Sequence, residues 1–329
     1  MKPTPGLRRT LLGALLLSLM VAAPVWSWAQ SWPAKPIKLI VPFPPGGATD
    51  ILARVLADKL PAKLGQPVIV ENKPGASTVI GVTAVAKAAP DGYTVLVSAG
   101  SSFAVLPALK PKLPFDIEKD FAPVSLSVTT PLVLVTSADK PYARLADLIA
   151  QASSKAKSVR YSSYGPGTSP QLASEILADT ARIDIEPIPF KGSSDALMAL
   201  VRGDVDMGLE TIAAAAPLIK SGKLRALAVT SPGRSAFLPG VPGLDELKLS
   251  AAAFEAFYAV ALPAGTPKAV VDSLSRAVAE VLADTDVKEK FSAQSLDVVA
   301  GGPEALAALM ARDIARFRAI GKRLNIELD

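Results

Sequence analysis

The chain has 329 residues, a formal net charge of +5, and neither cysteine nor histidine. Without these two residue types it has no disulfide, no thiol nucleophile and no Ser-His-Asp triad, and most zinc sites are excluded. Its lysines and arginines are scattered and aromatic residues make up only 5% of the chain, so we do not expect it to bind nucleic acid.

Residues 1–29 have the pattern of a secretory signal peptide. Lys2, Arg8 and Arg9 precede the apolar run TLLGALLLSLMVAAPVW, which ends near the small-x-small site Ser27-Trp28-Ala29. The run is short for a membrane span, and no later apolar stretch approaches the roughly 18 residues that a span needs. We therefore expect an exported, soluble product cleaved near Ala29. The three basic residues leave with this segment, so the formal charge falls from +5 to +2.

Short apolar segments alternate with helical patterns along the rest of the chain, which predicts an α/β protein with mostly parallel sheets. About 300 remaining residues are enough for two packed domains. The expected strands are 37–41, 67–71, 93–98, 131–136, 158–163, 183–189, 206–210, 224–230 and 257–263. Two proline-rich stretches, 106–114 and 231–243, are expected to be surface loops, and a helix is expected over 303–324.

The first expected strand continues into the sequence VPFPPGGATD, residues 41–50. Its prolines and glycines break the strand, and Thr49 or Asp50 can cap the helix that follows. Two adjacent glycines, Gly46 and Gly47, also expose backbone N–H groups at the start of that helix, a geometry that suits an anion. A carboxylate would repel such an anion, so we interpret Asp50 as a helix cap and not as a ligand group.

Other expected strands end in turns of similar composition, rich in glycine, hydroxyl groups and helix-capping residues. These turns contain Ser77-Thr78, Ser101-Ser102, residues 164–170 with Ser169 as a possible cap, and Lys191-Gly192. Ligands of open α/β sheets bind at the carboxyl ends of the strands. Donors outnumber carboxylates in these turns, so the expected ligand is an oxygen-rich anion, most simply a small carboxylate. One such turn is usually only a turn, and the interpretation depends on several occurring together.

Two positions keep alternative interpretations. Lys191 is either a solvated charge of its turn or the partner of a ligand carboxylate. Glu210-Thr211, at the end of an expected strand, is either a helix cap or part of a cleft wall.

The chain resembles the Bug or TctC-like family, the exported solute receptors of tripartite tricarboxylate transporters in Gram-negative bacteria. The stretches that carry the resemblance run in order from Trp32 to Leu274: WPAKPIKLIVPFPPGGATDILAR, ENKPGA, AKAAPDGYTVLV, SYGPGTSPQLASE, PIPFKGSSDAL, GDVDMGLETI, APLIKSGKLRALAVTS and LPAGTPKAVVDSL. No single stretch is decisive, but the ordered set is highly specific. The resemblance implies a two-lobed, type II-like periplasmic binding protein of the Venus-flytrap kind, with a mainly parallel sheet in each lobe and two crossing segments as the hinge. Lobe 1 would comprise residues 30–128 plus 256–329, and lobe 2 residues 129–255.

The resemblance also implies a periplasmic, monomeric receptor that uses no cofactor, metal or catalysis. It would hold a small organic anion between its lobes and deliver it to the permease subunits of a transporter. The residues expected to contact the ligand are Phe43, Pro45, Gly46, Gly47, Ser77, Ser101, Ser102, Ser163, Tyr164, Gly167, Thr168, Ser169, Lys191, Gly192, Glu210 and Thr211.

Two departures from the family pattern lie near the expected cleft. Many relatives continue with glycines where this chain has Ser77-Thr78, and many have aspartate and asparagine near the position of Glu210-Thr211. Unless it faces away, Glu210 disfavours a polyanion such as citrate. Two other functions stay open at this point. One is a sensor that presents its closed form to a membrane kinase, and the other is an exported hydrolase or isomerase that uses Asp204, Asp206 or Glu210.

Overall fold

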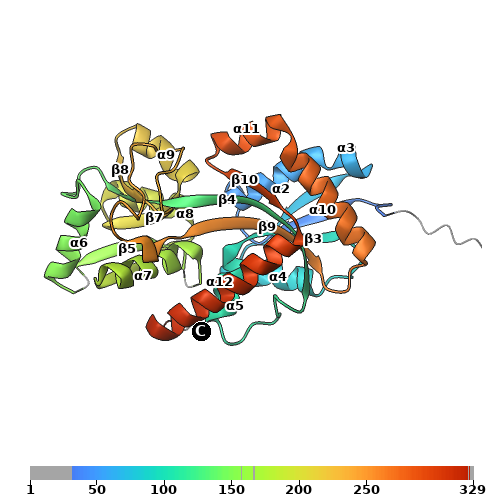
Figure 1. Ribbon diagram of the computed structural model, residues 1–329, viewed down its shortest axis with the longest axis horizontal. Helices are drawn as coiled ribbons and strands as arrows, with labels where there is room; N and C mark the ends of the chain where they lie inside the picture. The colour runs from blue at the N-terminus through green and yellow to red at the C-terminus, as the bar shows by residue number, and fades with distance from the viewer. Residues whose placement is uncertain (1–31, 157, 166, 325, 327–329) are drawn as a thin grey trace, which may run out of the picture.

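The computed structural model describes residues 32–156, 158–165, 167–324 and 326. Two halves lie side by side, and two long strands run from one half into the other (Figure 1). The expected signal peptide lies outside the described residues. Within the described ranges, no helix is long and apolar enough to cross a bilayer.

The first half is built on three parallel strands in the order β2-β1-β3. They are β1 (Ile37–Val41), β2 (Val68–Asn72) and β3 (Thr94–Ala99). The helices of this half are α2 (Ala48–Lys59), α3 (Pro61–Leu64), α4 (Val79–Ala86), α5 (Leu106–Leu109), α10 (Lys268–Ala283), α11 (Thr285–Ala293) and α12 (Pro303–Leu324), together with the short segments Ala76–Thr78 and Ser101–Val105. Leu52 and Leu56, one turn apart on α2, are fully buried, as the apolar stripe of an amphipathic helix requires.

The second half repeats this plan with β5 at its centre. The parallel strands are β5 (Val159–Ser163), β6 (Ile185–Pro189) and β7 (Met207–Thr211), in the order β7-β5-β6. The other elements are α6 (Leu145–Ser154), α7 (Ser169–Ala181), α8 (Ser193–Arg202), α9 (Ile212–Lys220), β8 (Leu224–Val229) and the turn Ser250–Ala252. Because β5, β6 and β7 are parallel, their carboxyl ends lie at the same edge of the sheet. The turns that lead from these strands into α7, α8 and α9 therefore all lie at that edge.

Two antiparallel strands, β4 (Phe121–Ser137) and β9 (Glu255–Pro263), cross between the halves. They pair from Phe121 opposite Pro263 to Pro131 opposite Glu255, and β9 lies between β3 and β4 in the sheet. From Leu132 onward β4 pairs instead with β7 and β8. The change of partner at residues 131–132 therefore marks the junction of the halves.

Thr230 closes this junction. Its buried hydroxyl accepts a hydrogen bond from the Leu132 amide at 2.8 Å and donates one to the Phe254 carbonyl at 2.6 Å. Its backbone N–H donates to the Leu132 carbonyl, and its carbonyl accepts from the Phe254 N–H. One side chain thus joins the end of β8 to both crossing strands.

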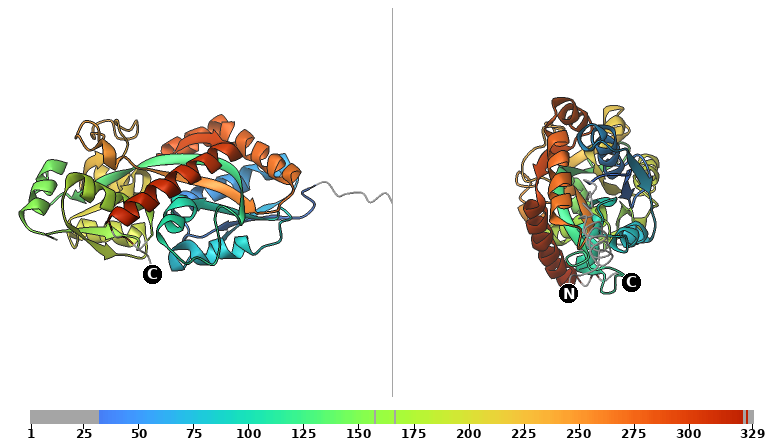
Figure 2. Two further views of the ribbon diagram at one scale, coloured as in Figure 1. Left: turned by 60° about the horizontal axis from the view of Figure 1, so that its bottom comes forward. Right: turned by 90° about the vertical axis from the view of Figure 1, so that its right-hand side faces the viewer.

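A second connection between the halves comes from the C-terminal helix. In Figures 1 and 2, α12 runs from the first half toward the second, and its last turn approaches α7. The Arg323 guanidinium lies 2.6 Å from the Asp179 carboxylate of α7, although both side chains are substantially exposed.

The nine expected strands are all present, with small shifts at their ends. Two strand segments were not expected: β10 (Asp297–Gly301), which pairs with β4, and the first part of β4. The sheet is mixed, because every pair that includes β4 or β9 is antiparallel. The expected parallel pairing is found among β1, β2 and β3 and among β5, β6 and β7. The loop expected over 106–114 begins as helix α5, in which Leu106 and Leu109 are buried.

We predict that Thr230→Val destabilises the protein by about 1–3 kcal/mol. Valine has nearly the same shape but leaves the buried Leu132 N–H without its side-chain acceptor. Urea denaturation at pH 7 measures the loss. Thr230→Ser keeps the hydroxyl and serves as the control, with a smaller loss expected, and equal losses for the two variants would contradict the assigned role of the hydroxyl.

Candidate functional site

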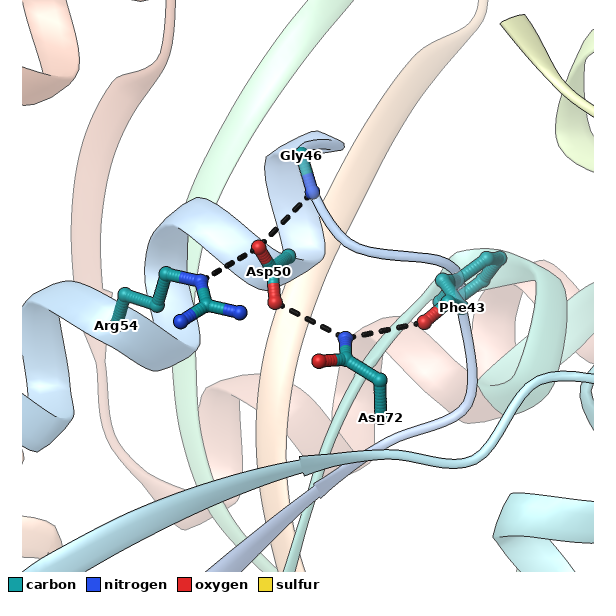
Figure 3. A network of polar contacts seen from close by, with 5 residues as sticks. All are labelled: Phe43, Gly46, Asp50, Arg54 and Asn72. Carbon is teal, nitrogen blue, oxygen red and sulfur yellow. Dashed lines mark hydrogen bonds and ion pairs between the residues drawn. The ribbon is translucent and has the colours of Figure 1, made fainter.

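The turn after β1 is held by a buried carboxylate (Figure 3). Asp50 Oδ2 accepts hydrogen bonds from the Gly46 N–H at 2.9 Å and from Arg54 Nε at 2.7 Å, and Oδ1 accepts from Asn72 Nδ2 at 2.9 Å. Asn72 Nδ2 also donates to the Phe43 carbonyl at 3.1 Å. Burial alone would raise the pKa of Asp50, but these hydrogen bonds outweigh it and the pKa lies below its ordinary value.

This arrangement corrects two expectations. The N-cap of α2 is Gly47, so neither Thr49 nor Asp50 caps the helix. Asp50 instead reaches back from the first turn and accepts from the N–H of Gly46, the residue before the N-cap. The Gly46 N–H is therefore already occupied. In the described part of the chain the Gly47 and Ala48 N–H groups have no acceptor, and they are the donors that this turn can offer to an anion.

The next two turns of the first half are joined by a chain of buried hydroxyl groups. Ser98 donates to Ser102 at 2.7 Å, and Ser102 donates to Thr78 at 2.8 Å. Ala76, Ser77 and Thr78 have φ values of 46°, 52° and 82°, a region that non-glycine residues rarely adopt. Such backbone costs of order 1–3 kcal/mol per residue, and residues of this kind cluster at ligand sites.

The two halves meet directly at Ser101 and Ser169. Ser101, which follows β3, accepts a hydrogen bond from the Ser169 backbone N–H at 3.2 Å, and the two hydroxyl oxygens lie 3.1 Å apart. Ser169 is the first residue of α7, and the N-cap is Thr168, one residue earlier than expected. The Gly167 N–H donates to Gln171 Oε1 at 3.1 Å, so this turn also uses one of its own donors.

Glu210, at the end of β7, is the centre of the site in the second half. Its side chain is fully buried, and Oε2 accepts hydrogen bonds from the Tyr164 hydroxyl and, at 2.7 Å, from Ser193 Oγ. Oε1 is buried and has no partner among the described residues. Burial raises the pKa of Glu210 to about 7, against the two hydrogen bonds, which lower it. Burial also raises the pKa of Tyr164, and the Glu210 charge adds to this shift.

The remaining predicted residues occupy the rims of these turns. Thr211 accepts from the Ala214 N–H at 3.4 Å and caps α9, and Gly192 is the N-cap of α8. Lys191 is exposed and makes no ion pair within the described ranges, which favours a solvated charge. Ser163 is buried and accepts from the Gly165 N–H at 3.0 Å. Pro45 is exposed beside Gly46.

The structure therefore brings together Ser101 with Ser169, and Tyr164 with Glu210. It gives no hydrogen bond from the described turn 43–47 to the second half. Residues absent from the predicted set also belong to these networks: Asn72, Thr78, Ser98 and Ser193. Only Asn72 and Ser98 could have been found from the sequence, because each is a polar residue at or near the end of an apolar strand.

The carboxylates of the hydrolase alternative do not form a pair. Asp206 forms an ion pair with Lys140 at 2.6 Å, and Asp204 forms one with Arg202 at 2.8 Å. Glu210 accepts hydrogen bonds from two hydroxyl groups. Within the part of the chain that the structure describes, no group of three or more metal-binding side chains occurs.

Fold and site together define a solute-binding protein of the periplasmic binding-protein type. More narrowly, the chain belongs to the tripartite tricarboxylate transporter receptor family, whose family model matches residues 52–326. BugT from Bordetella pertussis is 38% identical over 96% of this chain and 97% of its own length. Members of the family and its structural neighbours are solute-binding receptors and not enzymes, which removes the hydrolase or isomerase alternative.

Two solved structures carry ligands. MatC from Rhodopseudomonas palustris with bound malate has a TM-score of 0.82 and 31% identity, covering 88% of this chain and 99% of that one. A second R. palustris protein, with adipate, has a TM-score of 0.84 and 29% identity, covering 90% of this chain and 99% of that one. The receptors that this chain is similar to therefore include proteins with bound organic acids.

We predict that Asp50→Ala destabilises the protein by about 2 kcal/mol, because it removes a charged acceptor from three donors and leaves the Asn72 amide and Gly46 N–H unsatisfied. Urea denaturation at pH 7 measures the loss. Arg54→Ala removes only a partner that is 57% exposed, so its loss is expected to be much smaller than that of Asp50→Ala. Equal losses of stability in the two variants would show that the Asp50–Arg54 ion pair, and not the hydrogen bonds to Gly46 and Asn72, accounts for the stabilisation by Asp50.

Glu210→Gln is predicted to stabilise the protein above pH 7 and to have little effect near pH 4.5. In the folded protein the pKa of Glu210 is about 7, whereas its ordinary value is 4.5. The wild-type protein therefore loses stability as the pH rises from 4.5 through 7. The full loss is about 3 kcal/mol at 1.36 kcal/mol per pKa unit, and glutamine, which cannot ionise, avoids it. Melting curves from pH 4.5 to 8.5 test this. Parallel profiles for the two proteins would contradict the assignment.

Proposed function

We propose that this protein is a periplasmic receptor that captures a small organic anion, most simply a carboxylate, between its two halves. The observation that carries the proposal is the arrangement of strand ends. The turns after β1 to β3 and after β5 to β7 supply helix N-termini and hydroxyl groups, and one pair of these turns meets across the halves at Ser101 and Ser169. Amide and hydroxyl donors at helix N-termini stabilise a carboxylate without a cofactor.

The binding step follows from this arrangement. The lobes are residues 30–128 plus 256–329 and residues 129–255, with β4 and β9 as the hinge between them. An anion that bridges the Gly47 turn and the turns around Thr168 and Gly192 draws the lobes together and replaces water around its oxygen atoms. Charge-assisted hydrogen bonds are stronger in that drier environment. The residues expected from sequence to line the cleft stay our proposed contact set.

The proposed partners are the membrane subunits of a tripartite tricarboxylate transporter. Delivery to these subunits is a property of the family to which the chain belongs. A monomeric receptor suffices for the proposal, because each chain contributes both lobes.

We predict that at least one carboxylate stabilises the purified mature protein in a thermal-shift screen of mono-, di- and tricarboxylates, aromatic acids and acidic amino acids. A ligand at ~100 times its Kd adds roughly 2.7 kcal/mol, which gives a clear rise in melting temperature.

The double variant Thr168→Ala, Ser169→Ala is expected to lose most of this rise, because both residues lie at the N-terminus of α7. Ser153→Ala, on the exposed face of α6, is the matched control and should keep it. Stabilisation by neutral compounds alone, or by none of the panel, would overturn the proposal.

A further inference from the structure

Glu210 places a carboxyl group at the edge of the second half where two helices begin. Its Oε2 joins Tyr164, from the turn between β5 and α7, to Ser193, the first residue of α8. These are the turns that the proposed function assigns to the ligand anion. A single buried side chain therefore connects both anion-binding turns of this half.

No cation compensates this carboxyl group within the described residues. On β4 the residue paired with Glu210 is Val133, and the next residue along β7 is Thr211, the N-cap of α9. Among the described residues, the titratable side chains beside the cluster are the Tyr164 phenol and, from β9, Tyr258. Asp195, in the first turn of α8, is exposed. Lys191, before α8, is exposed.

The other charged groups near β7 and β5 are engaged elsewhere. Lys140 forms an ion pair with Asp206, which immediately precedes β7 and so lies at the end of the strand away from Glu210. Glu175 of α7 accepts a hydrogen bond from the Tyr161 hydroxyl of β5 at 2.5 Å. The charge state of Glu210 is therefore set by burial and by its two hydroxyl donors.

The two oxygens of Glu210 differ in a way that locates its proton. Oε2 accepts from two hydroxyl donors, which suits an unprotonated oxygen, whereas Oε1 is buried without a partner. A proton on Oε1 makes the group neutral without disturbing either hydrogen bond. An ionised Glu210 would repel an anion bound at the adjacent helix N-termini through a medium of low dielectric constant, whereas a neutral one would not.

We infer that binding of an organic anion to this receptor is coupled to the uptake of one proton by Glu210. This inference rests on the proposed function. The proton comes from solvent, adds to Oε1 as the anion enters, and leaves as the anion is released. Because burial places the pKa of the Glu210 carboxyl group at about 7, the coupling operates in the physiological range.

The test measures affinity against pH for five probes: malate, succinate, adipate, benzoate and nicotinate. Their carboxyl groups stay ionised between pH 6.5 and 8.5. For wild-type protein, Kd is expected to rise with pH, approaching about tenfold per pH unit above pH 8. Glu210→Gln accepts the same hydrogen bonds but cannot ionise, so its Kd should stay flat. Glu175→Gln alters the tyrosine-bonded glutamate of α7 and should keep the wild-type slope.

Calorimetry of the wild-type protein at pH 8 provides a measurement that needs no variant. In buffers of different ionisation enthalpy, the heat of binding is expected to reveal uptake approaching one proton per anion bound.

The outcomes separate the two proposals. If neither the five probes nor any other acid of the thermal-shift panel binds either protein across the pH range, the anion-receptor function is overturned, and the inference with it. Binding without a pH slope and without proton uptake would overturn the inference alone, as would a wild-type slope that persists in Glu210→Gln. A Kd that falls with pH would show that an ionised Glu210 attracts the ligand, and would also overturn it.

Discussion

The antiparallel pairing of β4 with β9 is the contact on which both halves depend. These strands supply the only long ladder that the described halves share, and β4 passes from one set of partners to another at residues 131–132. Breaking that ladder would leave buried N–H and carbonyl groups without partners, which is costly. The ladder therefore ties the two halves together, and the hydroxyl of Thr230 holds the place where β4 changes partners.

The two halves carry the same chemical group in opposite environments. Asp50 is buried but receives hydrogen bonds from a backbone amide, an amide side chain and a guanidinium, so its pKa falls and it stays charged. Glu210 is buried with two hydroxyl donors and has no cationic partner in the described part of the chain, so its pKa rises toward neutrality. The first carboxylate maintains the shape of its turn. The second responds to what occupies the space beside it, because small changes in local charge move a pKa that already lies near 7.

The alternating plan and the positions of the glycine-rich turns were predicted well, because strand and helix periodicity and glycine-rich breaks are local signals. It failed where the signal was weak. Pro123 and the buried serines 125 and 127 conceal the first part of β4, and β10 is a short strand with exposed and partly buried positions. Helix starts were displaced by one to three residues, since caps depend on backbone geometry. The contacts that define the site join residues 68 and 46 positions apart, and spacing along the chain cannot reveal them.

The position of β9 in the sheet has a consequence for how the molecule is assembled. β9 is inserted between β3 and β4, although some 120 residues of chain separate it from the end of β4. A nascent chain that has formed β1 to β4 still has a gap at the centre of its first sheet, with strand edges open on both sides. Sheet closure must wait until residue 263 is available, and the second half has been completely synthesised by then. A chain of this topology needs protection from premature pairing until its synthesis is almost complete.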